Sequence, residues 1–181
     1  MMPRRESVVT SRAVQVKCIP DGTPLELPEG TAAQLTQALG SSFSLVVGGQ
    51  LVQLKGVDAD AIGREVPVAP HVPDDVKPEE LRDIVWQILK TCYDPEIPVD
   101  IVELGLIYVC DVLPVEEGQF RVSIKMTLTA PGCGMGEILV DEITDKVRAL
   151  PHVADVDVEM VFDPPWNLTC MSEGAQLALG L

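Results

Sequence analysis

Histidine and paired cysteine are scarce in this chain, and both shortages narrow the chemistry that it can perform. Only two histidines occur, His71 and His152, so a cysteine hydrolase would have little choice of general base. The five cysteines are scattered and none forms a Cys-x-x-Cys pair. That spacing argues against a disulfide framework and against a self-contained zinc site. Reduced thiols are therefore expected.

Long apolar runs and basic charge are lacking as well. No stretch is long enough to span a bilayer, and the first residues lack the apolar core of a signal peptide. The chain has 13 Lys and Arg against 28 Asp and Glu, a formal charge of −15, which repels phosphate backbones. These shortages predict a cytoplasmic protein that binds neither nucleic acid nor membrane.

The composition is that of a globular protein, since 46% of the 181 residues are hydrophobic. Residues 1–64 contain short alternating segments separated by turn signals, and they predict a small β-rich module. Gly48-Gly49 between two apolar runs predicts a hairpin, whereas residues 31–39 fit either a strand or a short helix. Prolines interrupt residues 65–77, which are predicted to be an extended linker.

Residues 78–181 alternate between helical and strand patterns. Pro78 opens a helix whose apolar residues recur at helical spacing until Asp94-Pro95 stops it. Strands are predicted at 101–112, 120–129 and 156–162, with a second helix at 133–149. The order helix-strand-strand-helix-strand predicts a two-layer α/β domain in which both helices cover one face of the sheet. The predicted fold class is α+β.

Cys133 is the most informative single residue. It lies where an alternating strand meets a predicted helix start, with Gly132 and Gly134 on either side. A thiol at a helix N-terminus faces unpaired N–H groups and the positive end of the helix dipole, which favour the thiolate. Cys133 is therefore a candidate nucleophile or metal ligand. Cys18, Cys92 and Cys110 fit apolar core positions, whereas Cys170 either packs or approaches Cys133 as a second thiol.

Acidic residues gather in the segment Asp94-Pro95-Glu96-Ile97-Pro98. If this segment folds over the Cys133 turn, one thiolate and the carboxylates of Asp94 and Glu96 face a common pocket that suits iron or zinc. Thr127 and Thr129 could hydrogen-bond the sulfur or a bound species, although strand alternation explains them equally well. The P-loop ending Gly-Lys-Ser/Thr is missing, so nucleotide binding has weak support.

The segment from Asp94 to Tyr108, followed by Thr127-Leu128-Thr129-Ala130-Pro131-Gly132-Cys133, resembles the metal-sulfur cluster biosynthesis family. Asp163-Pro164-Pro165-Trp166 and Met171-Ser172-Glu173 fit it too, so the resemblance covers residues 77–181. With the upstream module, the whole chain resembles SufT-type iron-sulfur assembly factors. The resemblance implies a role in maturing iron-sulfur proteins, with Cys133 as the key thiol and Asp94 and Glu96 as motif positions.

Two departures from relatives matter. Many have Pro-Gly-Cys-Pro where this chain has Gly134 after the cysteine, which loosens the turn. The related ring-hydroxylation assembly proteins carry paired cysteines near the C-terminus that look like a zinc site, and their absence here disfavours that branch.

The leading hypothesis is a non-enzymatic maturation factor with no catalytic residue. Cys133 transiently ligates iron or an iron-sulfur cluster, which passes from the assembly machinery to client apoproteins. Because one cysteine cannot complete a cluster, a homodimer partner, a client or a small thiol must contribute ligands. One alternative is a thiol-dependent enzyme that uses Cys133 as nucleophile with Glu96 or Asp94 assisting. Another is an adaptor that docks clients through its acidic surface.

Overall fold

The computed structural model describes residues 5–38, 40–94, 97–129 and 135–181. The chain divides into two compact units, Met1–Val68 and Ala69–Leu181, and each is described by itself. The predicted domain limits at residues 64 and 78 stay predictions. Val72 and Val76, from the segment predicted as a linker, are buried in the core of the second unit. In the part of the chain that the structure describes, no helix is long and apolar enough to cross a membrane.

The first unit is a six-stranded antiparallel sheet with the order β1-β4-β5-β6-β2-β3. Its elements are β1 (Glu6–Val9), β2 (Val14–Cys18), β3 (Pro24–Leu27), β4 (Ala32–Gln37), β5 (Ser42–Val47), β6 (Gln50–Lys55) and the 3₁₀ turn η1 (Gly56–Ile62). The predicted hairpin joins β5 to β6, where Val47 pairs with Gln50 and both intervening glycines have positive φ. Residues 32–37 form a strand rather than a helix.

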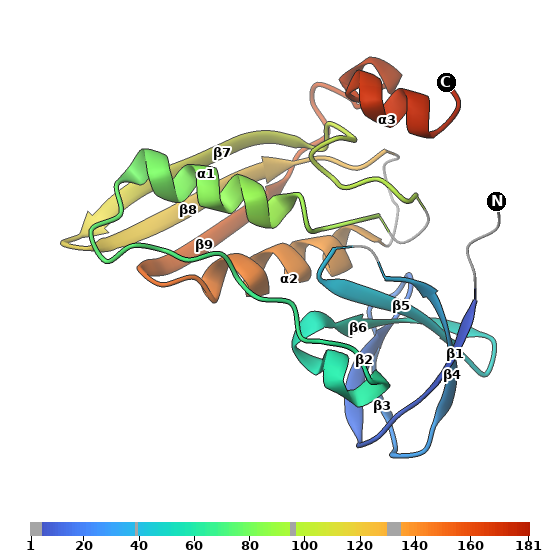
Figure 1. Cartoon of the computed structure of the whole chain (residues 1–181). Helices are drawn as coiled ribbons and strands as arrows, with labels where there is room; N and C mark the ends of the chain where they lie inside the picture. Colours follow the sequence, from blue (N-terminus) through green and yellow to red (C-terminus); the bar gives the residue numbers. More distant parts are fainter. Residues whose placement is uncertain (1–4, 39, 95–96, 130–134) are drawn as a thin grey trace. The chain divides into compact units, whose positions relative to one another are not determined.

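The second unit has the predicted order of elements (Figure 1). They are α1 (Pro78–Leu89), β7 (Ile107–Glu116), β8 (Gln119–Met126), α2 (Met135–Arg148), β9 (Val153–Met160), the 3₁₀ turn η2 (Leu168–Cys170) and α3 (Glu173–Ala178). In the sheet, β8 lies between an antiparallel β7 and a parallel β9. The predicted α+β fold class is confirmed, and α2 is the crossover that a parallel pair requires.

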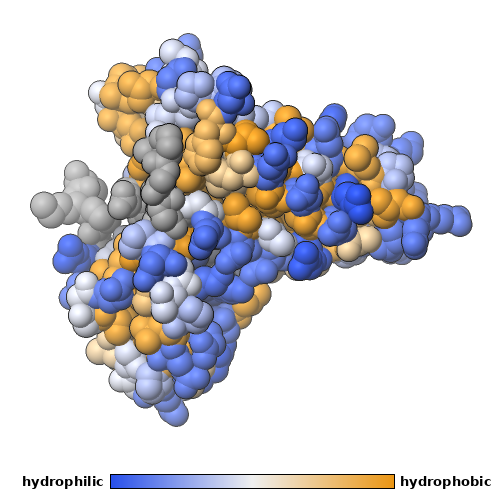
Figure 2. Space-filling model, turned by 180° about the vertical axis from the view of Figure 1, so that it is seen from behind, coloured by the Kyte–Doolittle hydropathy of each residue, from blue (hydrophilic) through white to orange (hydrophobic). Residues whose placement is uncertain are grey.

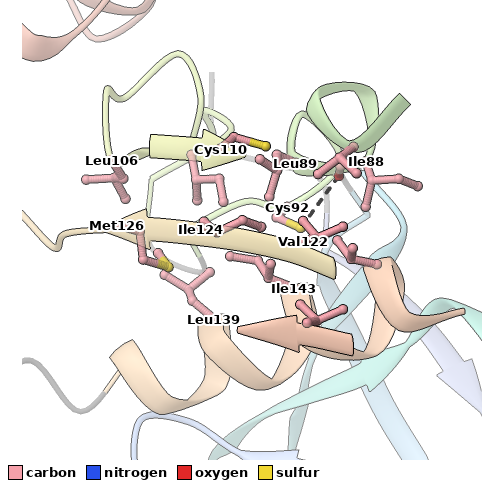
Figure 3. Close-up of a cluster of buried hydrophobic side chains, with 14 of the residues drawn as sticks. Ile88, Leu89, Cys92, Leu106, Cys110, Val122, Ile124, Met126, Leu139 and Ile143 are labelled. Atoms are coloured by element: carbon pink, nitrogen blue, oxygen red, sulfur yellow. Dashed lines mark hydrogen bonds between the residues drawn. The ribbon is translucent and has the colours of Figure 1, made fainter. Parts of the chain in front are cut away.

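The core of the second unit lies between the two long helices and one face of the sheet. Alternate residues of β8 (Val122, Ile124 and Met126) are buried, as the two-residue period of a strand requires. Figure 3 shows Leu139 and Ile143 of α2 on the same cluster, with Leu89 at the end of α1 and Cys92 just after it. This contact explains why both helices carry an apolar stripe at helical spacing.

One predicted element begins later than expected. The apolar run from Ile101 was predicted to be strand from its first residue, but β7 starts only at Ile107. The Asp100 carboxylate Oδ1 accepts hydrogen bonds from the N–H groups of Val102 and Glu103, both at 3.0 Å, and so stabilises a turn. Gly105, with φ of 74°, continues that turn in a conformation that other residues rarely adopt.

Candidate functional site

The acidic segment forms a loop that is closed at its base. The N–H of Ile101 donates to the carbonyl of Cys92 at 2.9 Å, and Tyr93 pairs with Asp100 in an isolated bridge. Inside this loop the half-buried Asp94 accepts a hydrogen bond through Oδ1 from the N–H of Ile97 at 3.2 Å. Glu96 lies outside the described residues. We call residues 93–100 the acidic loop.

Leu106 connects the acidic loop to the end of β8. Its N–H donates to the carbonyl of Ile101 at 3.0 Å, while its own carbonyl accepts from the N–H of Thr127 at 2.8 Å. Thr127 is the first residue after β8 and precedes the segment that contains Cys133. Leu106 is therefore hydrogen-bonded both to Ile101, which follows the acidic loop, and to Thr127, which precedes the Cys133 segment.

The two ends of the connection from β8 to α2 contact each other, at Leu128 and Gly136. Gly136, in the first turn of α2, lies against the Leu128 and Met160 side chains: a Cβ added there would be 3.0 Å from Leu128 Cδ1 and 3.4 Å from Met160 Cε. A larger residue at position 136 would require the Leu128 side chain to shift by a few tenths of an ångström. Gly132, Cys133 and Gly134 belong to this connection but lie outside the described residues, so their roles stay predictions.

The two threonines ahead of this connection have different surroundings. Thr129 is partly exposed, whereas Thr127 is fully buried. In residues 5–38, 40–94, 97–129 and 135–181, the Thr127 hydroxyl Oγ1 is the one buried side-chain oxygen or nitrogen that makes no hydrogen bond. Strand alternation alone predicted an ordinary surface position for Thr127, and its burial is a difference from that interpretation.

Residues 163–181, which we call the C-terminal strap, fasten the segment that follows the acidic loop. Trp166 Nε1 donates to the carbonyl of Leu104 at 2.7 Å. The N–H of Ser172 donates to the carbonyl of Glu103 at 2.9 Å, and the Ser172 hydroxyl also donates to the Glu103 carboxylate. Backbone and side-chain contacts thus hold residues 103 and 104 to the strap.

The strap also touches Gly105 directly. A Cβ added at Gly105 would lie 2.1 Å from the Cys170 carbonyl oxygen and 2.6 Å from its carbonyl carbon. Cys170 itself is partly exposed, and its proposed approach to Cys133 stays a prediction. The sequence signal for this contact is a lone glycine inside an apolar run, which is typical of close backbone approach.

Exposed apolar side chains mark the outer face of the strap. Leu168, Leu177 and Leu181 are all largely exposed, and Figure 2 shows hydrophobic surface over α3. The side chain of Gln176 donates to the Leu168 carbonyl at 3.3 Å, which places η2 beside α3. Inward, Met171 and Ala175 are buried in the core of the unit, so the strap is amphipathic.

Two further cysteines lie in the core, as predicted. Burial raises the pKa of the Cys92 thiol from 9.0 to about 12, and the negative charge of Glu142 adds to the increase. Burial also raises the pKa of the Cys110 thiol to about 11, with a further contribution from Asp111. Both thiols are therefore neutral and unreactive at physiological pH.

We expect Cys92 and Cys110 to resist iodoacetamide at pH 8 in the folded protein and to react after denaturation in urea. Peptide mass spectrometry would measure the labelled fraction of each. Because the folded state raises both pKa values, it binds these protons more tightly than the unfolded chain. The free energy of unfolding should thus fall as the pH rises from about 9 toward 12. Labelling of either peptide without urea would contradict this description of the core.

A buried ion pair that sequence reasoning missed ties α2 to the end of α1. Lys146 Nζ donates to Glu142 Oε1 at 2.5 Å and to the Thr91 carbonyl at 3.3 Å, and it lies 3.7 Å from Cys92 Sγ. The Lys146 and Glu142 side chains are only 17% and 7% exposed. Their spacing of four residues, next to the inward-facing Ile143, was the available signal.

No three His, Cys, Asp or Glu side chains converge to hold a metal ion among the described residues. Any ligand set of the predicted kind must include Cys133 or Glu96, which lie outside them. The described residues around the predicted site form its supports: the acidic loop, the end of β8, the first turn of α2 and the C-terminal strap.

Comparison with known proteins covers the second unit. The family model described as iron-sulfur cluster assembly protein matches residues 82–160. The "Fe-S protein maturation auxiliary factor YitW" of Bacillus subtilis is 43% identical over 103 residues, which are 57% of this chain and 97% of the relative. The "Fe-S protein maturation auxiliary factor SufT" of Staphylococcus aureus is 40% identical over 88 residues, 49% of this chain and 96% of the relative.

A solved structure shares both sequence and fold. It is a domain of unknown function, DUF59, from Bacillus anthracis, with 35% identity and a TM-score of 0.50 over 57% of this chain and 95% of that one. The relatives are thus matched over nearly their full length at high identity. The chain belongs to the iron-sulfur cluster assembly protein family.

Proposed function

We propose that the protein is an auxiliary factor for the maturation of iron-sulfur proteins. It takes up iron or an iron-sulfur cluster transiently through Cys133 and passes it to client apoproteins. Two relatives that it matches over nearly their whole length carry the name of such a factor. Its partners on this proposal are the assembly machinery, which supplies the cargo, and the clients, which receive it.

The observation that carries the proposal is an elimination among the cysteines. The family match at residues 82–160 contains Cys92, Cys110 and Cys133 but neither Cys18 nor Cys170. The first two are buried and their pKa values are raised to about 12 and about 11. Since a thiolate is the species that ligates metal, Cys133 is the one cysteine of the matched region that remains for this chemistry.

The proposed handling is an exchange of ligands. A thiolate suits iron, and the carboxylates of Asp94 and Glu96 can add oxygen ligands from the acidic loop. One cysteine cannot supply the four ligands that a cluster commonly takes, so the cargo remains bound to other groups as well. A client thiolate then replaces the Cys133 sulfur on iron with no change in oxidation state. An incomplete ligand set favours delivery over storage.

Replacing Cys133 with alanine should lower the activity of a client iron-sulfur enzyme to the level of cells that lack this protein. The variant removes the sulfur but leaves the buried supports intact. Client activity in complemented cells is the measurement, with protein abundance checked by immunoblot. Cys18→Ser is the matched control, because that thiol lies in the first unit and outside the matched region, and it should retain wild-type maturation.

Purified proteins separate this proposal from a thiol-dependent enzyme. After anaerobic reconstitution with ferrous iron and sulfide, wild type should retain iron and Cys133→Ala should not. A thiol enzyme would instead turn over a substrate without iron. Full client maturation by Cys133→Ala at equal abundance would show that the sulfur has no such role.

A further inference from the structure

Thr127 has a buried hydroxyl whose position folding does not explain. Its side chain is 0% exposed and, among the described residues, Oγ1 has no hydrogen-bond partner. A buried hydroxyl without a partner loses its hydration and gains nothing in return. Such groups are rare in native proteins and generally indicate a bound water, a ligand or a functional constraint.

The local fold does not need this hydroxyl. The backbone N–H of Thr127 already pairs with the Leu106 carbonyl at 2.8 Å, and the flanking side chains of Met126 and Leu128 are buried and apolar. A valine would keep the branched shape of threonine and remove the cost of the unpaired oxygen. Stability alone would therefore favour valine at this position.

The surroundings of Thr127 connect it with the supports of the candidate site. Through Leu106 it is linked to the base of the acidic loop, and the next residue, Leu128, touches the first turn of α2. Thr127 is thus bonded through its backbone to the residue that follows the acidic loop, and it precedes Cys133 by six residues in the sequence. Among the described residues, its Oγ1 is the one buried side-chain oxygen or nitrogen without a hydrogen-bond partner.

The C-terminal strap is attached to the chain next to the strand partner of Thr127, whose N–H pairs with the Leu106 carbonyl. The strap is hydrogen-bonded on both sides of Leu106, through Trp166 to the Leu104 carbonyl and through the Pro164 carbonyl to the Tyr108 hydroxyl. Lys125, two residues before Thr127 and on the same face by strand alternation, is half exposed. Exposure therefore falls from half at Lys125 to none at Thr127.

We propose that the Thr127 hydroxyl is kept for a bound partner and donates a hydrogen bond to an electron-rich sulfur. The sulfur is either the Cys133 thiolate or a sulfide of the cargo, both of which are anionic acceptors. This inference rests on the proposed function. Hydrogen bonds to charged acceptors are the strong ones, and donors beside a metal-bound sulfur orient it and change its affinity for metal. Thr127 is thus a positioning residue for the sulfur.

The test compares Thr127→Val with Thr127→Ser, which keeps a hydroxyl. Urea denaturation of the metal-free proteins should show that Thr127→Val is at least as stable as wild type. After anaerobic reconstitution with ferrous iron and sulfide, Thr127→Val should bind iron roughly tenfold more weakly or worse. Thr127→Ser should bind iron nearly as well as wild type. A stable variant with weakened binding is the expected combination.

Two reconstitutions identify the source of the sulfur. Weaker binding by Thr127→Val with ferrous iron alone would assign the acceptor to the Cys133 thiolate. A loss that appears only when sulfide is added would assign it to the cargo. Iron binding equal to wild type in both reconstitutions would overturn the inference. A marked loss of metal-free stability in Thr127→Val would also overturn it, because the hydroxyl would then serve the fold.

Cys133→Ala, measured in parallel, separates failure of the inference from failure of the proposed function. If Cys133→Ala loses iron while Thr127→Val retains it, the inference is wrong and the proposed function stands. If wild type and Cys133→Ala behave alike, the proposed function is wrong, and the role assigned to Thr127 is overturned with it.

Discussion

Replacing Gly105 with alanine should lower the free energy of unfolding of the second unit by about 2–5 kcal/mol. Gly105 has φ of 74°, a conformation that costs other residues roughly 1–2 kcal/mol. The added Cβ would also lie 2.1 Å from the Cys170 carbonyl oxygen. Because that atom belongs to the backbone of the strap, it can move away only if the strap shifts.

Gly118→Ala is the matched control for this prediction. Gly118 has a similar φ of 71°, but a Cβ there meets nothing within 4 Å. Its replacement should therefore show only the conformational cost of about 1–2 kcal/mol. Urea denaturation of both variants measures the difference, which reports the contact with the strap. Limited proteolysis should cut the strap faster in Gly105→Ala. Equal losses of stability in the two variants would show that the strap does not press on Gly105.

Replacing Lys146 with methionine should cost about 3–5 kcal/mol. The ammonium group of Lys146 is the ion-pair partner of the Glu142 carboxylate, which is only 7% exposed. The variant would remove the ammonium group from beside this buried carboxylate and would also remove a donor to the Thr91 carbonyl just after α1. The loss should appear as a lower denaturation midpoint with an unchanged dependence on urea concentration.

The exposed pair Arg121–Asp155 provides the control. Its side chains are 52% and 50% exposed, and Arg121→Met should cost less than about 1 kcal/mol because water already screens the pair. The double replacement of Glu142 by leucine and Lys146 by methionine should recover most of the stability, since no buried charge remains. If Lys146→Met cost no more than Arg121→Met, burial would not set the strength of this pair.

Local patterns predicted the order of elements in the second unit well. The stripe of Leu81, Val85 and Leu89 has helical spacing, and these residues are buried in α1. The alternation from Phe120 to Met126 likewise matches the burial along β8. Gly48-Gly49 predicted its hairpin because positive φ is a local property of glycine. Each of these signals depends on residues that are close in the sequence.

Features that depend on distant residues were missed. The apolar run after Asp100 was predicted to be strand, but the Asp100 side chain and the approach of Cys170 to Gly105 make it a turn. Thr127 alternates like a surface residue and yet is fully buried. The candidate site was predicted from the Cys133 motif and the acidic loop. The structure adds contacts between segments that are distant in the sequence. Leu106 pairs with Ile101 and with Thr127, and Gly136 lies against Leu128.

Because the strap follows the rest of the second unit in the sequence, its contacts form late during synthesis of the chain. Ser172 and Trp166 fasten residues 103 and 104, and a ribosome makes them some 60 residues later. Before they are synthesised, a nascent chain can form α1 and the β7–β8 hairpin, but the turn after the acidic loop lacks its hydrogen bonds to Trp166 and Ser172. The turn at residues 103 and 104 is therefore fastened only after the helices and strands that precede the strap have been synthesised.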